Sequence, residues 1–265
     1  MSCIGLMHRG KPNTSMDRRQ IVSVLDIDPE LGERLDPESR ALAQRHALAR
    51  LERVERGTWR PAESEWATGA FGLLIVDGLL LHEVSIAGRE TAELLGPGDV
   101  LRTVESDDEY EAVPVTSRWQ VCEPVRVAVL DQRFAAVAGR WPALLDGVVE
   151  RAIRRSKRLA VQLTVTRVTR VDERLLIILW QLAERWGRVS SDGVRLPLAV
   201  THDTLARLVG ARRPSVTTAL GRLGRLGMIQ RVRGGWVLFG DPQQQLARLE
   251  SDRDGMDVPE HAVGA

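Results

Sequence analysis

Arginine and hydroxyl side chains between residues 201 and 240 are the groups in this chain best suited to bind a ligand, and that ligand would be a polyanion. The segment holds seven arginines and one acid, Asp203, in a chain whose formal net charge is +1. A basic surface on one small part of a near-neutral protein indicates binding to phosphate. The candidate contact residues are Arg212, Arg213, Ser215, Thr217, Thr218, Arg222, Arg231 and Arg233.

Two short amphipathic helices are predicted to position these side chains. Apolar residues repeat at helical spacing after Thr201, which is a suitable N-cap, and again after Pro214, which is tolerated in a first helical turn. Gly210 lies between them, where one helix must end and the backbone must turn through positive φ. A helix, a glycine turn and a second helix form the arrangement in which the second helix enters the DNA major groove.

A hairpin is predicted after the second helix. Residues 228–232 and 236–239 are apolar, strand-like runs, and Gly234-Gly235 between them favours a tight turn. The segment is therefore predicted to be a winged helix-turn-helix. The alternative is a helical hairpin that only packs against its neighbour.

Length, composition and cysteine content limit which class of protein this chain can be. The length of 265 residues and the hydrophobic content of 43% predict a packed chain of two domains. Cys3 and Cys122 lie far apart and indicate neither a disulfide framework nor a metal cluster, so we expect no metal and no cofactor. No apolar run is long enough to cross a bilayer, and the N-terminus lacks the apolar core of a signal peptide. We therefore expect a cytoplasmic protein that makes no membrane contact.

The fold class is predicted to be α+β, with an N-terminal antiparallel β-roll or jelly roll. Residues 1–20 are expected to be disordered, and residues 21–138 to form the roll with flanking helices, one of them over residues 42–54. About eight short strands are predicted between residues 58 and 130, with turns at Asp77-Gly78 and at Gly88.

Residues 139–171 are predicted to form a long dimerisation helix, running from Pro142 to about Arg170. Its apolar residues keep a heptad-like spacing, which favours a second copy of the same helix as partner. They are Leu145, Val149, Ala152, Leu159 and Leu163. The alternative is that this stripe packs on the β-domain of its own chain. Residues 172–241 are assigned to the winged helix-turn-helix domain, and residues 242–265 to a flexible tail that starts as a frayed helix.

This order of elements resembles the Crp/Fnr family of bacterial transcription regulators from about Val24 to Asp241. LVGARRPSVTTALGRLGRLGMI, from Leu208 to Ile229, is similar to the family's recognition segment. IVDGLLLHEV, followed by ELLGPGDVL, is similar to the entry of its β-roll. The resemblance implies a homodimer that binds double-stranded DNA, and it adds RNA polymerase as a candidate partner.

The resemblance also assigns roles to single residues. Arg213 matches the arginine that contacts a guanine, and arginine is the natural bidentate donor to that base. Ser215 matches a hydroxyl residue that contacts backbone or base. Pro214 and Thr218 replace two of the family's usual base readers, so the family's consensus operator is not expected here. Arg212 would add a phosphate contact, and Arg231 and Arg233 on the wing would position the protein on phosphates.

The effector site departs from the family pattern. Members that bind cyclic AMP carry a Gly-Glu pair and an Arg-Ser/Thr-Ala motif after the Gly-x-Gly-Asp turn, and this chain has neither. The acidic run from Glu105 to Glu111 would repel a cyclic phosphate. We therefore predict that cyclic AMP is not bound in the usual way, and no other effector is identifiable. An iron–sulfur cluster would need about four cysteines, and His82 is a lone histidine in the roll, which favours a packed or exposed residue over a ligand.

The main hypothesis is a dimeric, sequence-specific DNA-binding transcription regulator. Two alternatives remain, namely a regulator that binds a cyclic nucleotide through a divergent pocket and a module whose winged helix contacts protein instead of DNA. A cupin-like enzyme would need several metal-binding histidines, and no nucleophile–base pair indicates another reaction. We therefore expect no enzymatic activity.

Overall fold

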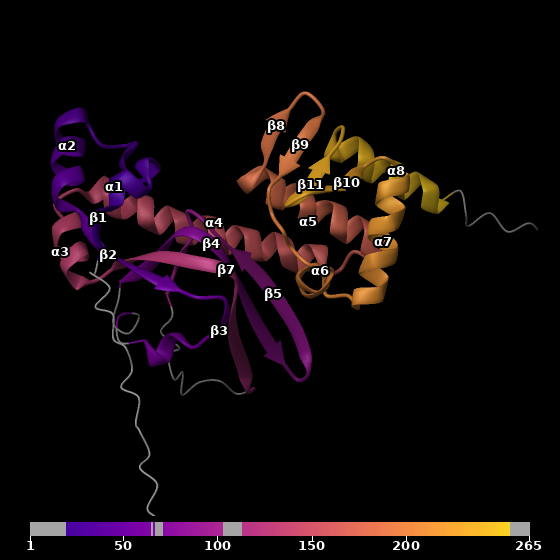
Figure 1. The fold of residues 1–265 in the computed structure, drawn as a ribbon, viewed down its shortest axis with the longest axis horizontal. Helices are drawn as coiled ribbons and strands as arrows, with labels where there is room; N and C mark the ends of the chain where they lie inside the picture. Colours follow the sequence, from indigo (N-terminus) through magenta and orange to yellow (C-terminus); the bar gives the residue numbers. More distant parts are fainter. Residues whose placement is uncertain (1–19, 65, 67–70, 103–112, 255–265) are drawn as a thin grey trace, which may run out of the picture.

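The computed structural model describes residues 20–64, 66, 71–102 and 113–254. Nearly all of the segment predicted to be disordered, and the acidic run from Glu105 to Glu111, lie outside the described residues. Figure 1 shows a β-rich unit and a helical unit side by side, with the long helix α4 (Pro142–Val165) passing along both. This arrangement agrees with the α+β class expected from the sequence.

The β-rich unit is one antiparallel sheet that curls into a roll. Its strand order is β1-β2-β7-β4-β5, with β3 paired to β7 and β6 paired to β4. The strands are β1 (Gln20–Ser23), β2 (Leu48–Val54), β3 (Gly57–Trp59), β4 (Gly72–Ile86), β5 (Arg89–Leu95), β6 (Val100–Leu101) and β7 (Val115–Leu130). The short helical segments are α1 (Val24–Ile27), η1 (Pro29–Gly32), α2 (Pro37–His46), η2 (Pro61–Glu63) and α3 (Gln132–Ala138).

In the described part of the roll, the strands are fewer and longer than the sequence suggested. Asp77-Gly78 was predicted to be a hairpin turn, but β4 continues through it and the register with β7 shifts there. Gly78 has φ +85°, and a Cβ at that position would lie 2.2 Å from the carbonyl oxygen of Pro124. The Asp-Gly pair therefore forms a bulge in a continuous strand. The turn at Gly88 is confirmed, because it joins β4 to β5.

The helix predicted over residues 42–54 is wrong in its second half. Helix α2 ends at His46, and residues 48–54 form strand β2. Arg50 in β2 pairs with Ile21 on one side and with Val129 on the other. Pairing with strands distant in the sequence decides the conformation here, against a local pattern that also suits a helix.

Helix α4 is shorter than predicted, because it ends at Val165 and not near Arg170. The Thr166 hydroxyl donates to the carbonyl oxygen of Leu163, and the chain turns before α5 (Val171–Trp186). The predicted dimerisation segment 139–171 therefore contains α4 and the turn that follows it.

The helical unit is a winged helix-turn-helix, as predicted. Its remaining elements are β8 (Arg188–Ser190), β9 (Gly193–Leu196), α6 (His202–Val209), α7 (Arg213–Arg225), β10 (Ile229–Val232), β11 (Gly235–Leu238) and α8 (Pro242–Asp254). The small sheet has the order β10-β11-β9-β8. The flexible tail assigned to residues 242–265 needs correction, because α8 packs on α5. Leu249 is fully buried, and Trp180 Nε1 donates to Gln245 Oε1 at 3.0 Å.

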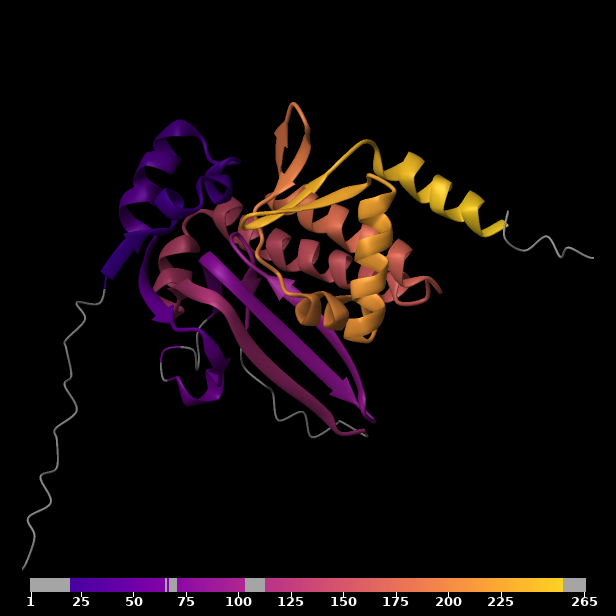
Figure 2. The same ribbon diagram turned by 45° about the vertical axis from the view of Figure 1, so that its right-hand side comes forward.

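One hydrophobic cluster contains residues from both units. Leu79 and Leu81 of β4 and Ala92 and Leu94 of β5 are buried in the same cluster as the apolar residues of α5, α6 and α7. Figure 2 shows the β4–β5 hairpin extending beside α6 and α7. The roll therefore supports the helix-turn-helix directly, and not only through the connecting helix.

Candidate nucleic-acid interface

Local capping interactions fix the start and the end of the first helix of the motif. Thr201 is the N-cap of α6, and its hydroxyl accepts from the amide of Thr204 at 3.1 Å. Gly210 has φ +59°, and its N–H bonds back to the carbonyl of Arg207. Both predictions for this turn are therefore confirmed. Only glycine adopts this left-handed conformation without strain, so the direction in which α7 leaves the turn depends on it.

One side of helix α7 is buried and the other side is exposed to solvent. Its buried residues are Val216, Ala219, Leu220 and Leu223. The exposed residues at its beginning are Arg212, Arg213, Ser215, Thr217 and Thr218. Thr217 and Thr218 donate to the carbonyls of Arg213 and Pro214, at 3.1 and 3.2 Å, as hydroxyls on helices commonly do. All five predicted contact residues of this helix start therefore lie together on one open surface.

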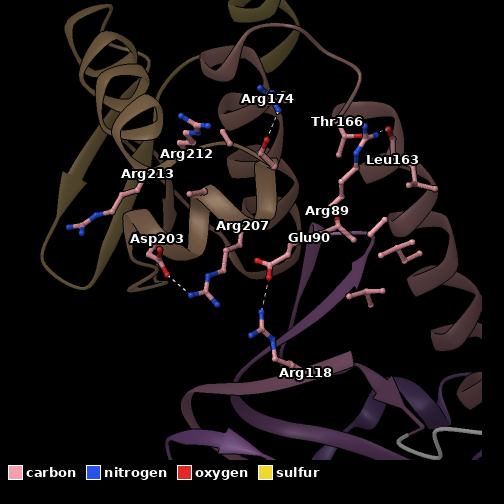
Figure 3. Close-up of a pocket in the computed structure, with 17 residues that line it drawn as sticks. Arg89, Glu90, Arg118, Leu163, Thr166, Arg174, Asp203, Arg207, Arg212 and Arg213 are labelled. Atoms are coloured by element: carbon pink, nitrogen blue, oxygen red, sulfur yellow. Dashed lines mark hydrogen bonds and ion pairs between the residues drawn. The ribbon is translucent and has the colours of Figure 1, made fainter. Parts of the chain in front are cut away.

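Arg212 and Arg213 are available to a ligand. Neither side chain makes an ion pair or a hydrogen bond with another described residue. Figure 3 shows the Arg213 side chain extending away from the roll. Arginines without an internal partner can give all five N–H donors to phosphate or to base edges.

Two of the predicted phosphate contacts have partners within the protein. Arg222 donates to Asp172 Oδ2 at 2.6 Å, and Asp172 is buried. Arg231 on β10 donates to the carbonyl of Val200 at 3.1 Å and lies over the ring of Trp236. Arg233 is exposed, in the turn between β10 and β11. Arg222 and Arg231 therefore have structural contacts beside the DNA contacts predicted for them.

A cleft of about 1390 Å³ separates the β4–β5 hairpin from α6 and the beginning of α7. Figure 3 shows the charged side chains that line it. Arg207 pairs with Asp203 at 2.9 Å, Arg118 pairs with Glu90 at 2.9 Å, and Arg174 donates to the carbonyl of Val209 at 2.7 Å. Arg207 of α6 also pairs with the buried Glu83 of β4, and this ion pair joins the two units across the cleft.

A polar stripe on α4, which the sequence analysis did not identify, binds the roll along about three helical turns. Arg151, Arg155, Arg158 and Gln162 follow one another at helical spacing. Arg151 donates to the carbonyl of Gly98 at 2.8 Å and to Asp28 Oδ1 at 2.7 Å. Arg155 pairs with Glu93 and Arg158 with Asp99, and Gln162 donates to the carbonyl of Ala92. The spacing was visible in the sequence, but arginines at such positions suit a solvated helix face equally well.

Asp99 is the point at which three elements meet. It belongs to the Gly-Pro-Gly-Asp turn, is 4% exposed, and accepts the amide of Gly96 at 2.9 Å. Arg158 of α4 and Arg185 of α5 bind its two oxygens. Burial lowers the pKa of Arg185, and Asp99 acts in the opposite direction. This carboxylate therefore joins the roll to the first helix of the DNA-binding unit.

His82 and Glu93 form a second buried network on the inner face of the roll. His82 Nδ1 lies 3.0 Å from Glu93 Oε1, its Nε2 lies 2.9 Å from the Ser117 hydroxyl, and its ring stacks on Trp119. Burial alone would raise the pKa of Glu93, but hydrogen bonds from His82 and Arg155 outweigh it and lower the pKa from 4.5 to about 2. His82 is therefore a packed residue with two polar partners. Within the described ranges, no His, Cys, Asp and Glu side chains gather as metal ligands would.

Comparison with known proteins identifies the family. Residues 173–249 match the Crp-like helix-turn-helix domain. The CRP-like cAMP-activated global transcriptional regulator of Mycobacterium tuberculosis is 30% identical over 164 residues, which cover 61% of this chain and 70% of that protein. The regulatory protein CysR of Synechococcus elongatus is 29% identical over 143 residues, covering 52% and 60% of the two chains.

A solved structure shows the same fold. A double mutant of CooA from Carboxydothermus hydrogenoformans superposes with a TM-score of 0.59 at 20% identity, covering 76% of this chain and 87% of that one. The chain belongs to the Crp/Fnr family of transcription regulators and carries the DNA-binding helix-turn-helix of that family. Its relatives are regulators and not enzymes, as expected from the sequence. Among the described residues, no helix has both the length and the apolar character needed to cross a bilayer.

The Glu93 network predicts a pH-dependent contribution to stability. A carboxyl whose pKa is lower in the folded state stabilises the fold at pH values above 4.5, and this contribution disappears as the pH falls through about 2. Glu93→Gln should therefore lower the free energy of unfolding near pH 7 by on the order of 3 kcal/mol. Denaturant titrations at a series of pH values should show this difference shrinking below about pH 4.5.

Glu63→Gln is the matched control for this experiment, because Glu63 pairs with Arg60 in an exposed ion pair. Its cost should stay below about 1 kcal/mol. A Glu93→Gln effect that does not change with pH would contradict the prediction.

Proposed function

We propose that this protein is a homodimeric regulator that reads specific DNA sequences through the beginning of α7. The observation that carries the proposal is the exposed surface of Arg212, Arg213, Ser215, Thr217 and Thr218 on a helix whose other side is buried. In a helix-turn-helix, residues at the N-terminal end of the second helix contact base edges. Arg213 supplies the bidentate donor to guanine, while Arg212 and Arg233 supply phosphate contacts.

Pro214 and Thr218 restrict which bases of the operator α7 can recognise. Pro214 lies in the first turn of α7, where it offers no polar side chain. The hydroxyl proton of Thr218 is directed to the carbonyl of Pro214, which leaves the Thr218 oxygen as an acceptor and its methyl group for apolar contact. The operator should therefore keep the guanine read by Arg213 and differ from the family consensus at the neighbouring positions.

The exposed apolar side of α4 supports dimerisation. Val149 and Leu163 belong to the predicted stripe and are 47% and 66% exposed, and Ile153 beside them is also exposed. The opposite side of α4 is the polar stripe that binds the roll. Leu145, at the start of the stripe, packs against the core of the roll, but the part of the stripe from Val149 to Leu163 is exposed, and a second copy of α4 would cover it. Such a dimer would present two copies of α7 to a near-palindromic site.

The arginines of α4 argue against the usual response to cyclic AMP. Arg151, Arg155 and Arg158 face the roll, but each is bound to a carboxylate of this chain. A cyclic phosphate would have to compete with these buried pairs for its cationic partner. Together with the missing Gly-Glu and Arg-Ser/Thr-Ala motifs, this supports a regulator that does not use cyclic AMP in the manner of its relatives. RNA polymerase is retained as a proposed partner.

Arg213→Ala should abolish sequence-specific recognition, because it removes the donor to guanine. The loss should be about 1–3 kcal/mol of binding free energy on the selected site. Immunoprecipitation of bound genomic DNA, followed by sequencing, should give a palindromic motif for the wild type and none for the variant. Arg225→Ala is the control, since Arg225 is exposed at the other end of α7. Equal enrichment by wild type and Arg213→Ala would refute sequence reading by Arg213.

Val149→Glu combined with Leu163→Glu should convert the dimer into a monomer, because four carboxylates would be placed in one apolar interface. Analytical ultracentrifugation measures the change in mass directly. Val161→Glu is the matched control, because Val161 is 47% exposed and lies on neither stripe of α4. A double variant that remains dimeric would place the interface elsewhere.

Isothermal titration calorimetry with unlabelled cyclic AMP and cyclic GMP should show no binding at micromolar concentrations. The physical reason is that the guanidinium groups facing the roll are already neutralised by Asp28, Glu93 and Asp99. Binding of either nucleotide at micromolar affinity would reject this part of the proposal and favour a divergent nucleotide pocket.

A further inference from the structure

We propose that His202 binds DNA phosphate in its protonated form, so that the DNA affinity of this protein rises as the pH falls from about 8 to about 6. The inference rests on the proposed DNA-binding function and adds to it a contact residue and a dependence on pH. It comes from the position of one imidazole at the junction of α6 and α7. The sequence analysis did not include His202 among the contact residues.

His202 belongs to the same surface as the exposed beginning of α7. It is the first residue of α6, and its Nδ1 lies 3.0 Å from the hydroxyl oxygen of Thr217 on α7. In a helix-turn-helix, the second helix occupies the major groove while the first crosses the DNA backbone. A side chain that joins the start of α6 to the exposed side of α7 is therefore placed beside the phosphates that flank the groove.

The hydrogen bonds of Thr217 determine which nitrogen of His202 carries a proton. Thr217 donates its one hydroxyl proton to the carbonyl of Arg213, at 3.1 Å. With the proton placed there, the Thr217 oxygen accepts in the contact with His202, and Nδ1 is the donor. In the neutral ring, Nε2 is left with a lone pair, and none of the described residues bonds to it.

Protonation therefore changes His202 at one atom and leaves its contact with α7 intact. Nε2 gains a hydrogen, and the ring gains a positive charge, while Nδ1 continues to donate to Thr217. The neutral ring offers a phosphate only a lone pair, which repels it. The charged ring offers a charge-assisted hydrogen bond.

The acid next to His202 is already paired and the other charged neighbours are cations, so DNA phosphate is the anion proposed to pair with it. Asp203, the next residue, is bound by Arg207 at 2.9 Å. Arg213 lies on the facing part of α7, and Arg231 of β10 donates to the carbonyl of Val200, two residues before His202. The surroundings are therefore cationic apart from an acid that is already paired. DNA supplies the anion that favours the charged imidazole, which couples binding to proton uptake.

The test is a fluorescence anisotropy titration of the full-length protein on its selected operator, carrying a rhodamine label, at about pH 8 and about pH 6 over a range of salt concentrations. The wild type should bind about three- to tenfold more tightly at the lower pH in physiological salt. The slope of log affinity against log salt should steepen by about 0.9, which corresponds to one additional phosphate contact.

Two substitutions separate charge from structure. His202→Gln keeps a polar side chain but cannot gain a charge, and it should bind at both pH values as the wild type does at about pH 8. His202→Arg is always charged, and it should show high affinity and the steeper slope at both. His46→Gln is the matched control, because His46 lies in the roll at the end of α2 and should keep the full wild-type response.

Several outcomes would overturn the proposal. If His202→Gln kept the wild-type gain at low pH, another group would be responsible. If it weakened binding by the same factor at both pH values, His202 would only position α7. A wild type that binds no specific DNA at either pH would instead reject the proposed function itself, so the two failures can be told apart.

Discussion

The buried carboxylate of Asp99 is the constraint on which the arrangement of the molecule depends. A carboxylate is stable in a protein interior only when donors replace the water it has lost. The Gly96 amide, Arg158 and Arg185 are those donors, and they come from the turn itself, from α4 and from α5. Each of the three elements therefore depends on the other two, and the turn of the roll is connected to the DNA-binding unit without an intervening linker.

Helix α4 combines two tasks because its two sides carry different chemistry. The guanidinium and amide stripe binds the roll, and the exposed apolar stripe is the surface that we propose for a second copy. Since side chains every three or four residues share a side of a helix, one sequence of 24 residues specifies both surfaces. The polar stripe also fixes the rotation of α4 about its own axis. It thereby determines that Val149 and Leu163 face away from the roll.

Local signals predicted the helix-turn-helix well and the roll poorly. The cap at Thr201, the left-handed glycine at position 210 and the glycine turn of the wing each act within a few residues, so the sequence contains the whole cause. Strand β2 and the bulge at Gly78 depend on the second half of β7, which lies more than 40 residues away along the chain. Their conformation follows from pairing, and a local pattern cannot show whether Asp-Gly ends a strand or bends it.

The difference between local signals and long-range contacts also explains how much of the candidate site could be predicted. Sequence identified its arginines but not their partners, and partners decide which arginines remain for DNA. Arg222 is bound to Asp172, 50 residues away, whereas Arg212 and Arg213 make no ion pair with any described residue. Breaking one buried ion pair costs about 3–5 kcal/mol. This cost is larger than the coupling free energy of about 1–3 kcal/mol that typically links a ligand to a distant site. Arg222 ties α7 to Asp172 of α5, and Arg207 ties α6 to Glu83 of β4, so the ion pairs of these arginines fix the placement in which we propose that Arg213 meets DNA.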